Sequence, residues 1–194
     1  MSKLECSTLI FLGLPHSGKS STAMSLSKDS NIEHINVGEM LRSVIKEQNE
    51  LSSYKEILQV VSDGENVSDD IVGEIVEENM IEMNDKNVIL DGFPREVNSI
   101  PTFYSVMNRC QRNFEKILIC HFTIPEEQSI KLNRERKRDI GLKPWSIDNR
   151  YKNFKDKEIP LINLFKSTHN YVELSFESGM SENIQKIRKM IDAC

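Results

Sequence analysis

The residues around Lys19 have the spacing of a phosphate-binding loop. Gly13 is followed, after four residues, by Gly18, Lys19 and Ser20, which satisfies the pattern G-x-x-x-x-G-K-[ST]. An apolar run ends just before Gly13 and a helical pattern begins near Gly18, so backbone N–H groups and a helix N-terminus would converge on one anion. We expect Lys19 to reach the β- and γ-phosphates of a nucleoside triphosphate, and Ser20 to bind Mg²⁺.

A histidine stands in the middle of this loop. His16 could contact phosphate as an imidazolium, but the intermediate positions of the motif accept many side chains. We therefore interpret its side chain as a tolerated one that points to solvent.

A second set of charged residues follows two other apolar segments. Residues 88–96 form a strand pattern that ends at Asp91 and turns into Arg95, and residues 35–42 give a strand, a turn and a helix that carries Arg42. An acidic residue at a strand end can hold Mg²⁺ through water beside a phosphate loop, and two arginines can clamp a second phosphate. This second anion site favours a phosphate acceptor over a P-loop nucleotide hydrolase, in which water is the acceptor.

Alternating strand and helix patterns must position these residues. Apolar runs predict five strands and periodic apolar positions predict helices between them; the strand patterns span residues 4–13, 33–37, 86–94, 115–124 and 171–176. This order predicts one α/β domain over residues 1–194, with a doubly wound parallel sheet whose strand carboxyl ends carry the site. Ser68 is a candidate N-cap, and Pro160 is expected to kink or break the long helical segment 146–167.

The composition limits the possible classes of function. The chain has 194 residues, 38% hydrophobic and 28% charged, and a net charge of −5 that argues against broad nucleic-acid binding. No apolar run approaches the roughly 20 residues of a membrane span. The cysteines have no metal-binding spacing, so we expect Cys6 and Cys120 to be buried free thiols in a reducing compartment, the cytoplasm.

With these motifs in order, the chain resembles the adenylate kinase and UMP-CMP kinase family of nucleoside monophosphate kinases. Residues 91–95, DGFPR, match a motif of that family without change. The loop GLPHSGKSS and residues 37–42, 64–69 and 150–162 resemble four further segments of it. The resemblance extends in order over essentially the whole chain.

The resemblance implies the reaction MgATP + NMP to ADP + NDP, with ATP and Mg²⁺ as cofactors. It also implies a P-loop-type five-stranded parallel sheet with helices on both faces, a helical acceptor-binding region at about residues 38–68, and a short lid at about residues 134–147. The expected partner is a nucleoside monophosphate, with AMP favoured, and neither nucleic acid nor membrane is expected to bind. We expect a monomer.

The resemblance also assigns roles to single residues. Donor contacts are implied for Gly13, Pro15, His16 (through its backbone), Ser17, Gly18, Lys19, Ser20, Ser21, Lys131 and Arg134. Acceptor contacts are implied for Val37, Gly38, Arg42, Val67, Gly92, Arg95, Asn98 and Ser99. Catalytic roles are implied for Lys19, Asp91, Arg95, Arg138 and Arg150, and Mg²⁺ binding for Ser20 and Asp91, partly through water.

Several positions depart from the family pattern. Ser20 stands where the family has glycine, and Ser99 stands where adenylate kinases have the glutamine that reads adenine. Val37 replaces a threonine, and Lys131 replaces a lid arginine. A UMP/CMP kinase is therefore an alternative, and so is a non-catalytic homologue that only binds nucleotide.

Overall fold

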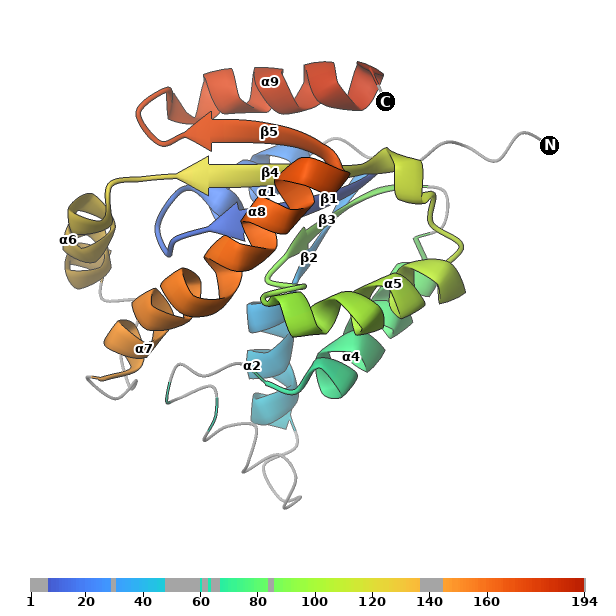
Figure 1. Ribbon diagram of the computed structural model, residues 1–194, viewed down its shortest axis with the longest axis horizontal. Coiled ribbons are helices and arrows are strands. Elements are labelled where there is room, and N and C mark those ends of the chain that lie inside the picture. Colours follow the sequence, from blue (N-terminus) through green and yellow to red (C-terminus); the bar gives the residue numbers. More distant parts are fainter. Residues whose placement is uncertain are drawn as a thin grey trace.

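The chain folds around a five-stranded parallel sheet with the strand order β2-β3-β1-β4-β5 (Figure 1). The computed structural model describes residues 7–28, 31–47, 60, 63, 67–83, 86–136 and 145–193. The strands are β1 (Thr8–Gly13), β2 (Ile32–Asn36), β3 (Asn87–Asp91), β4 (Ile117–Thr123) and β5 (Asn170–Ser175). Both the predicted α/β class and the predicted five-stranded parallel sheet are confirmed.

Helices cover both faces of the sheet. They are α1 (Lys19–Leu26), α2 (Val37–Glu47), α4 (Asp69–Ile81), α5 (Ile100–Arg109), α6 (Glu126–Arg136), α7 (Trp145–Asn153), α8 (Ile159–Thr168) and α9 (Gly179–Ala193). Short 3₁₀ turns lie at Val97–Ser99 and Phe114–Lys116, and a π-helical turn spans Phe154–Glu158. None of the described helices is long and apolar enough to cross a membrane.

The sheet separates two apolar cores, one on each of its faces, because successive side chains of a strand point in opposite directions. On β1, Ile10 and Leu12 pack into a core with side chains of α4, α5 and α8. Leu9 and Phe11 point the other way, into a core with α1 and α9. Figure 1 shows α9 running along β5 on one side, with α5 and α8 on the other. Both cores are covered, so the sheet is buried on both faces.

A buried arginine closes the amino end of the sheet. Arg112 is 6% exposed, and its guanidinium donates to Thr8 Oγ1 and to the carbonyl oxygens of Ser7, Met83 and Lys86 at 2.9–3.3 Å. These acceptors lie just before β1 and β3, or at the start of β1. Arg112 therefore joins the strand starts and leaves the strand carboxyl ends open for the site.

Three local features differ from the sequence analysis or refine it. Helix α5 was not predicted, although Phe103, Val106 and Met107 on it are completely buried. Ser68 does precede α4, but its side chain makes no capping hydrogen bond; its carbonyl accepts the amide of Val72 at 3.1 Å instead. The segment around Pro160 divides as expected, because the proline lies in the first turn of α8 after the π-helical turn.

Candidate active site

The phosphate loop begins where β1 ends, at a glycine that no other residue could replace without strain. Gly13 has φ 136°, and a Cβ atom there would collide with the carbonyl oxygen of Phe122 on β4. Gly18, with φ 99°, is the N-cap of α1. The amide of Ser17 donates to the carbonyl of Leu14 at 3.3 Å, and Ser17 is 2% exposed. The loop thus connects a fixed strand end to a helix N-terminus, which favours an anion.

Lys19 lies folded back over this loop. Its Nζ donates to the carbonyl oxygens of Gly13 at 2.5 Å and Leu14 at 2.8 Å. Loss of solvation lowers the pKa of Lys19, while the carboxylates of Asp91 and Glu158 act in the opposite direction. The ammonium is held by carbonyl oxygens rather than by a direct ion pair, so it can turn toward an incoming phosphate.

Asp91 ends β3 beside the loop and is 6% exposed. Ser20 Oγ donates to its Oδ2 at 2.8 Å, and His34 Nε2 on β2 lies 3.6 Å from the same oxygen. Burial alone would raise the pKa of Asp91, but His34, Lys19 and Ser20 together hold it below its ordinary value. Asp91 is therefore an anion at neutral pH, and the predicted pair of Ser20 and Asp91 is in direct contact.

A second carboxylate reaches the loop from the π-helical turn. Glu158 Oε1 accepts the backbone N–H of Gly13 at 2.6 Å. Burial raises the pKa of Glu158, although Lys19, Arg95 and the Gly13 amide lower it. Two carboxylates with opposite pKa shifts therefore lie within electrostatic reach of Lys19.

The turn after β3 brings together three of the predicted acceptor-site residues. Arg95 is exposed, and its Nε donates to the carbonyl of Gly92 at 2.9 Å. Gly92 has φ 108°, and a Cβ atom there would lie 3.0 Å from an Arg95 guanidinium nitrogen and 3.6 Å from the Cβ of Val37. Val37, 3% exposed, begins α2. Gly92 therefore leaves room for the arginine beside the start of α2.

The other predicted acceptor residues lie around this turn at different depths. Gly38 and Arg42 are on α2, and Val67 lies just before α4. Asn98 is exposed, whereas Ser99 is completely buried at the start of α5. The part of the acceptor-binding region between residues 47 and 67 lies outside the described residues, except for residues 60 and 63.

Helix α6 is bonded to the phosphate loop. Ser129 Oγ donates to the carbonyl of Pro15 at 2.5 Å and contacts Tyr151 Oη on α7 at 2.7 Å. One turn further, Asn133 Oδ1 is 2.7 Å from His16 Nε2. The interpretation that His16 points to solvent is therefore wrong. A φ of 60° directs its side chain toward α6, where a hydrogen-bond partner is available.

The four charged residues predicted in or beside the lid have different surroundings. Arg134 is exposed and lines a cavity of about 470 Å³ between α6 and α7, together with Asn133 and Tyr151. Lys131 is 76% exposed and lies 4.0 Å from Glu135. Arg150 is half-buried on α7. Arg138 and residues 137–144 of the predicted lid lie outside the described residues.

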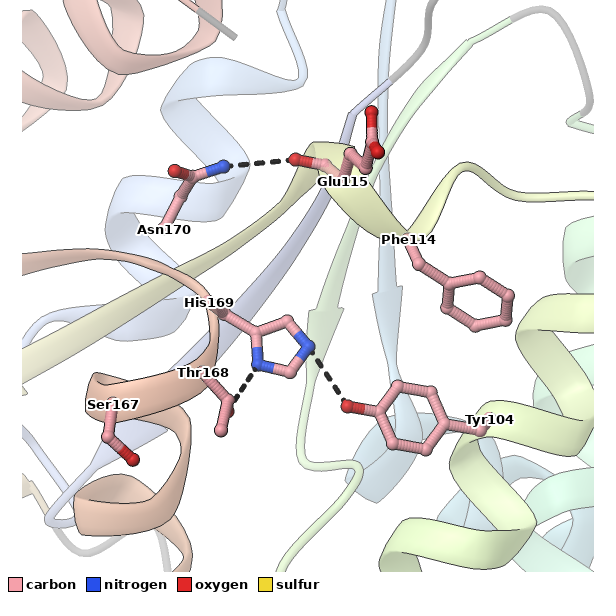
Figure 2. Close-up of a pocket in the computed structure, with 7 residues that line it drawn as sticks. All are labelled: Tyr104, Phe114, Glu115, Ser167, Thr168, His169 and Asn170. Atoms are coloured by element: carbon pink, nitrogen blue, oxygen red, sulfur yellow. Dashed lines mark hydrogen bonds between the residues drawn. The ribbon is translucent and has the colours of Figure 1, made fainter.

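A larger concavity, of about 730 Å³, lies away from the phosphate loop. It is bounded by residues just before β4 and around the start of β5, and Figure 2 shows the side chains of Tyr104, His169 and Thr168 turned toward one another. His169 bonds to Tyr104 at 3.0 Å and to Thr168 at 2.8 Å, and Asn170 donates to the Glu115 carbonyl at 3.0 Å. The hydrogen-bonding groups of His169, Tyr104 and Thr168 are thus used within the protein, and none of the predicted site residues lines this concavity.

Sequence reasoning did not identify four of the residues at the site. His34 lies beside Asp91 only because β2 pairs with β3 in a register that sets His34 opposite Ile89. Glu158, Ser129 and Asn133 come from helices more than 100 residues after the loop. The four-residue spacing of Ser129 and Asn133 was visible, but nothing local related it to the loop.

Comparison with known proteins agrees with this geometry. The family model for adenylate kinase matches residues 11–170. The adenylate kinase of Synechococcus sp. (strain CC9902) is 29% identical over 184 residues, 95% of this chain and 98% of that protein. The adenylate kinase of Prochlorococcus marinus (strain MIT 9515) is 34% identical over 163 residues, 82% of this chain and 84% of that protein. The adenylate kinase of Mycoplasma mobile is 39% identical over 119 residues, which cover 60% of this chain and 51% of that protein. The chain therefore belongs to the adenylate kinase family, and with it to the ATP-dependent phosphotransferases that act on nucleoside monophosphates.

Proposed function

We propose that this protein transfers the γ-phosphoryl group of MgATP to AMP, which gives two molecules of ADP. The observation that carries the proposal is the cluster at the strand carboxyl ends, where Lys19 is within electrostatic reach of the Asp91 carboxylate that Ser20 contacts, and Arg95 follows on the same edge. A nucleotide hydrolase, whose acceptor is water, does not need cations that hold the phosphate of a second nucleotide. The acceptor is taken as AMP because the similar proteins are named adenylate kinases.

The residues at this edge suit Mg²⁺ bound with the donor. Ser20 Oγ and Asp91 Oδ2 lie 2.8 Å apart, and Asp91 is an anion, so both offer the hard oxygen ligands that Mg²⁺ prefers. Among the described residues no group of three acidic, histidine or cysteine side chains could hold a metal alone. This fits a metal that takes its other ligands from phosphate oxygens and water. When bound, Mg²⁺ would neutralise part of the phosphate charge.

In this proposal Lys19 and the backbone of residues 14–20 hold the donor phosphates. Arg95 and Arg42 hold the acceptor phosphate, and Arg150 and Arg138 reach the transferring group. No general base is needed, because the attacking acceptor oxygen is already an anion. Catalysis consists of positioning and charge neutralisation.

The remaining donor and acceptor contacts follow the same division. On the donor side we propose Gly13, Pro15, His16, Ser17, Gly18, Ser20, Ser21, Lys131 and Arg134, with residues 134–147 as the lid that excludes water. On the acceptor side we propose Val37, Gly38, Val67, Gly92, Asn98 and Ser99, within or beside the region of about residues 38–68. The protein acts as a monomer. The buried free thiols of Cys110 and Cys120 suit a reducing, cytoplasmic compartment.

A coupled assay that detects ADP tests the proposal. The purified chain is given MgATP and, in turn, AMP, dAMP, CMP, UMP or GMP, and we expect AMP to be the best acceptor. A preference for CMP or UMP would assign the pyrimidine alternative. No ADP with any acceptor, despite measurable ATP binding, would leave only the non-catalytic alternative.

The acceptor role of Arg95 has its own test. Arg95→Ala is expected to lower kcat/KM on the order of 10³-fold, about 4 kcal/mol, because the acceptor phosphate loses its cation. The Kd of ATP, measured by calorimetry, should stay within about twofold. A large loss of ATP affinity instead would assign Arg95 to the donor phosphates.

A further inference from the structure

Glu158 brings a negative charge to a loop whose purpose is to bind anions. Its carboxylate accepts the N–H of Gly13 at 2.6 Å, while the carbonyl of that same residue accepts Lys19 Nζ at 2.5 Å. Lys19 and Glu158 are therefore bonded to opposite sides of one glycine. A hydrogen bond to Gly13 requires only an acceptor, and a neutral glutamine would supply one.

A local change in helix geometry before Pro160 places this carboxylate at the loop. Pro160 lies in the first turn of α8 and cannot donate to the carbonyl four residues earlier, that of Asp156. The helix is widened over Phe154–Glu158 into a π-helical turn that contains Asp156, and Glu158 is its last residue. The side chain of Lys157 in this turn lies 3.6 Å from Glu96, which follows Arg95 in the sequence. The turn is thus attached to both the donor and the acceptor side of the site.

The charged groups that face Glu158 come from three elements. Lys19 on α1 and Arg95 after β3 attract its carboxylate, and Asp91 at the end of β3 repels it. In the present arrangement the two cations partly neutralise Glu158. A bound nucleotide would turn both cations toward its phosphates and would also add several negative charges nearby.

We propose that Glu158 is a positioning residue that competes with nucleotide phosphates for Lys19 and Arg95, and thereby weakens nucleotide binding and speeds product release. This inference rests on the proposed function. The carboxylate and the phosphates compete for the same two cations: a phosphate group that binds must draw Lys19 and Arg95 away from Glu158. Binding is then accompanied by proton uptake at Glu158, because protonation removes the repulsion between the carboxylate and the phosphates.

The matched pair Glu158→Gln and Glu78→Gln separates this role from a structural one. Glutamine keeps the acceptor for the Gly13 amide and removes only the charge. Glu78 is an exposed carboxylate on α4, away from the loop, so Glu78→Gln controls for the loss of one negative charge. Thermal unfolding of both variants checks that each one folds.

The experiment is calorimetric titration with ADP at pH 7.5, with and without Mg²⁺, in two buffers that differ in ionisation enthalpy. We expect Glu158→Gln to bind ADP about tenfold more tightly than the unaltered protein, with or without Mg²⁺. The unaltered protein and Glu78→Gln should take up a fraction of a proton on binding that Glu158→Gln does not take up. Stopped-flow displacement should show ADP leaving Glu158→Gln about tenfold more slowly.

Other outcomes would overturn the inference in distinguishable ways. Equal affinity and equal proton uptake in all three proteins would leave Glu158 as a structural tie to Gly13. Weaker binding by Glu158→Gln only when Mg²⁺ is present would make Glu158 a metal ligand. If Glu158→Gln does not fold, absence of proton uptake by the unaltered protein would itself contradict the inference. No ADP binding by the unaltered protein would refute the proposed function, and the inference with it.

Discussion

The two ends of the parallel sheet hold cations in opposite ways. At the amino end, Arg112 is 6% exposed, and its guanidinium donates to three backbone carbonyl oxygens and to Thr8. At the carboxyl end, Lys19 is half-buried, donates to two carbonyls of its own loop and faces two carboxylates. The first cation is fixed by backbone groups from two segments, and the second can exchange local acceptors for a phosphate. The same sheet thus has one end built for stability and one built for ligand binding.

The largest expected effect belongs to the carboxyl end. Lys19→Met should lower kcat/KM on the order of 10³-fold, because the transferring phosphoryl group loses its nearest cation. The free energy of unfolding, measured in urea, should not fall, since the ammonium is desolvated. Its hydrogen bonds to described residues all lie within its own loop. A loss of stability as large as that of an Arg112 variant would remove the distinction between the two ends.

The amino end should give the reverse result. Arg112→Met is expected to lower the free energy of unfolding by about 3 kcal/mol, because the carbonyls of Ser7, Met83 and Lys86 would lose the guanidinium that joins them. Urea unfolding monitored by circular dichroism measures this, and kcat per folded molecule should be unchanged. The control is Lys189→Met on α9, an exposed cation whose removal should change stability by less than about 0.5 kcal/mol. A specific loss of kcat in folded Arg112→Met would contradict the comparison.

A smaller effect, dependent on pH, is expected only at the carboxyl end. The pKa of Asp91 is held below the ordinary 3.8, so its charge stabilises the folded state above that pH, and the contribution disappears as the pH falls through the folded-state value. Asp91→Asn should therefore be less stable than the unaltered protein by about 1 kcal/mol at pH 7, with the difference shrinking below about pH 4. Urea unfolding at a series of pH values measures it. A difference that grows on acidification would have the wrong sign.

The smallest effect concerns the loop itself. His16→Gly removes a side chain from a φ of 60°, which relieves strain of about 1 kcal/mol, but it also removes the bond to Asn133, which is worth about the same. Thermal unfolding should therefore show a net change within about 1 kcal/mol. His16→Ala keeps the strain and loses the bond, so it should be the less stable of the two variants. If both variants are equally stable, the positive φ of His16 carries no cost.

These differences also explain what the sequence could predict. Lys19, Ser20 and Asp91 were predictable because the motif spacing and the strand end are local properties, and their contact follows from β1 and β3 lying side by side. Arg112 was not, because no pattern marks a single arginine whose acceptors lie in two separate segments, one before and at the start of β1 and one before β3. His34 depends on the register of β2, and Glu158 depends on a π-helical turn; neither can be derived from residue types alone. Helix α5 was visible in principle, since Ile100, Phe103 and Met107 recur at helical spacing.

The pairing of β1 with its two neighbouring strands determines how Gly13 and Asp91 are placed relative to each other. Gly13 is paired with Phe122 on β4, and Phe11 is paired with Asp91 on β3, both through the parallel sheet. A register slip of one residue would shift Asp91 by about 3.3 Å along the strand and turn it to the opposite face. The relative positions of Gly13, where the phosphate loop begins, and Asp91 are therefore set by backbone strand register. A helix that carries none of the predicted site residues, such as α9, could change in sequence without moving these two positions, provided that Gly13 remains a glycine.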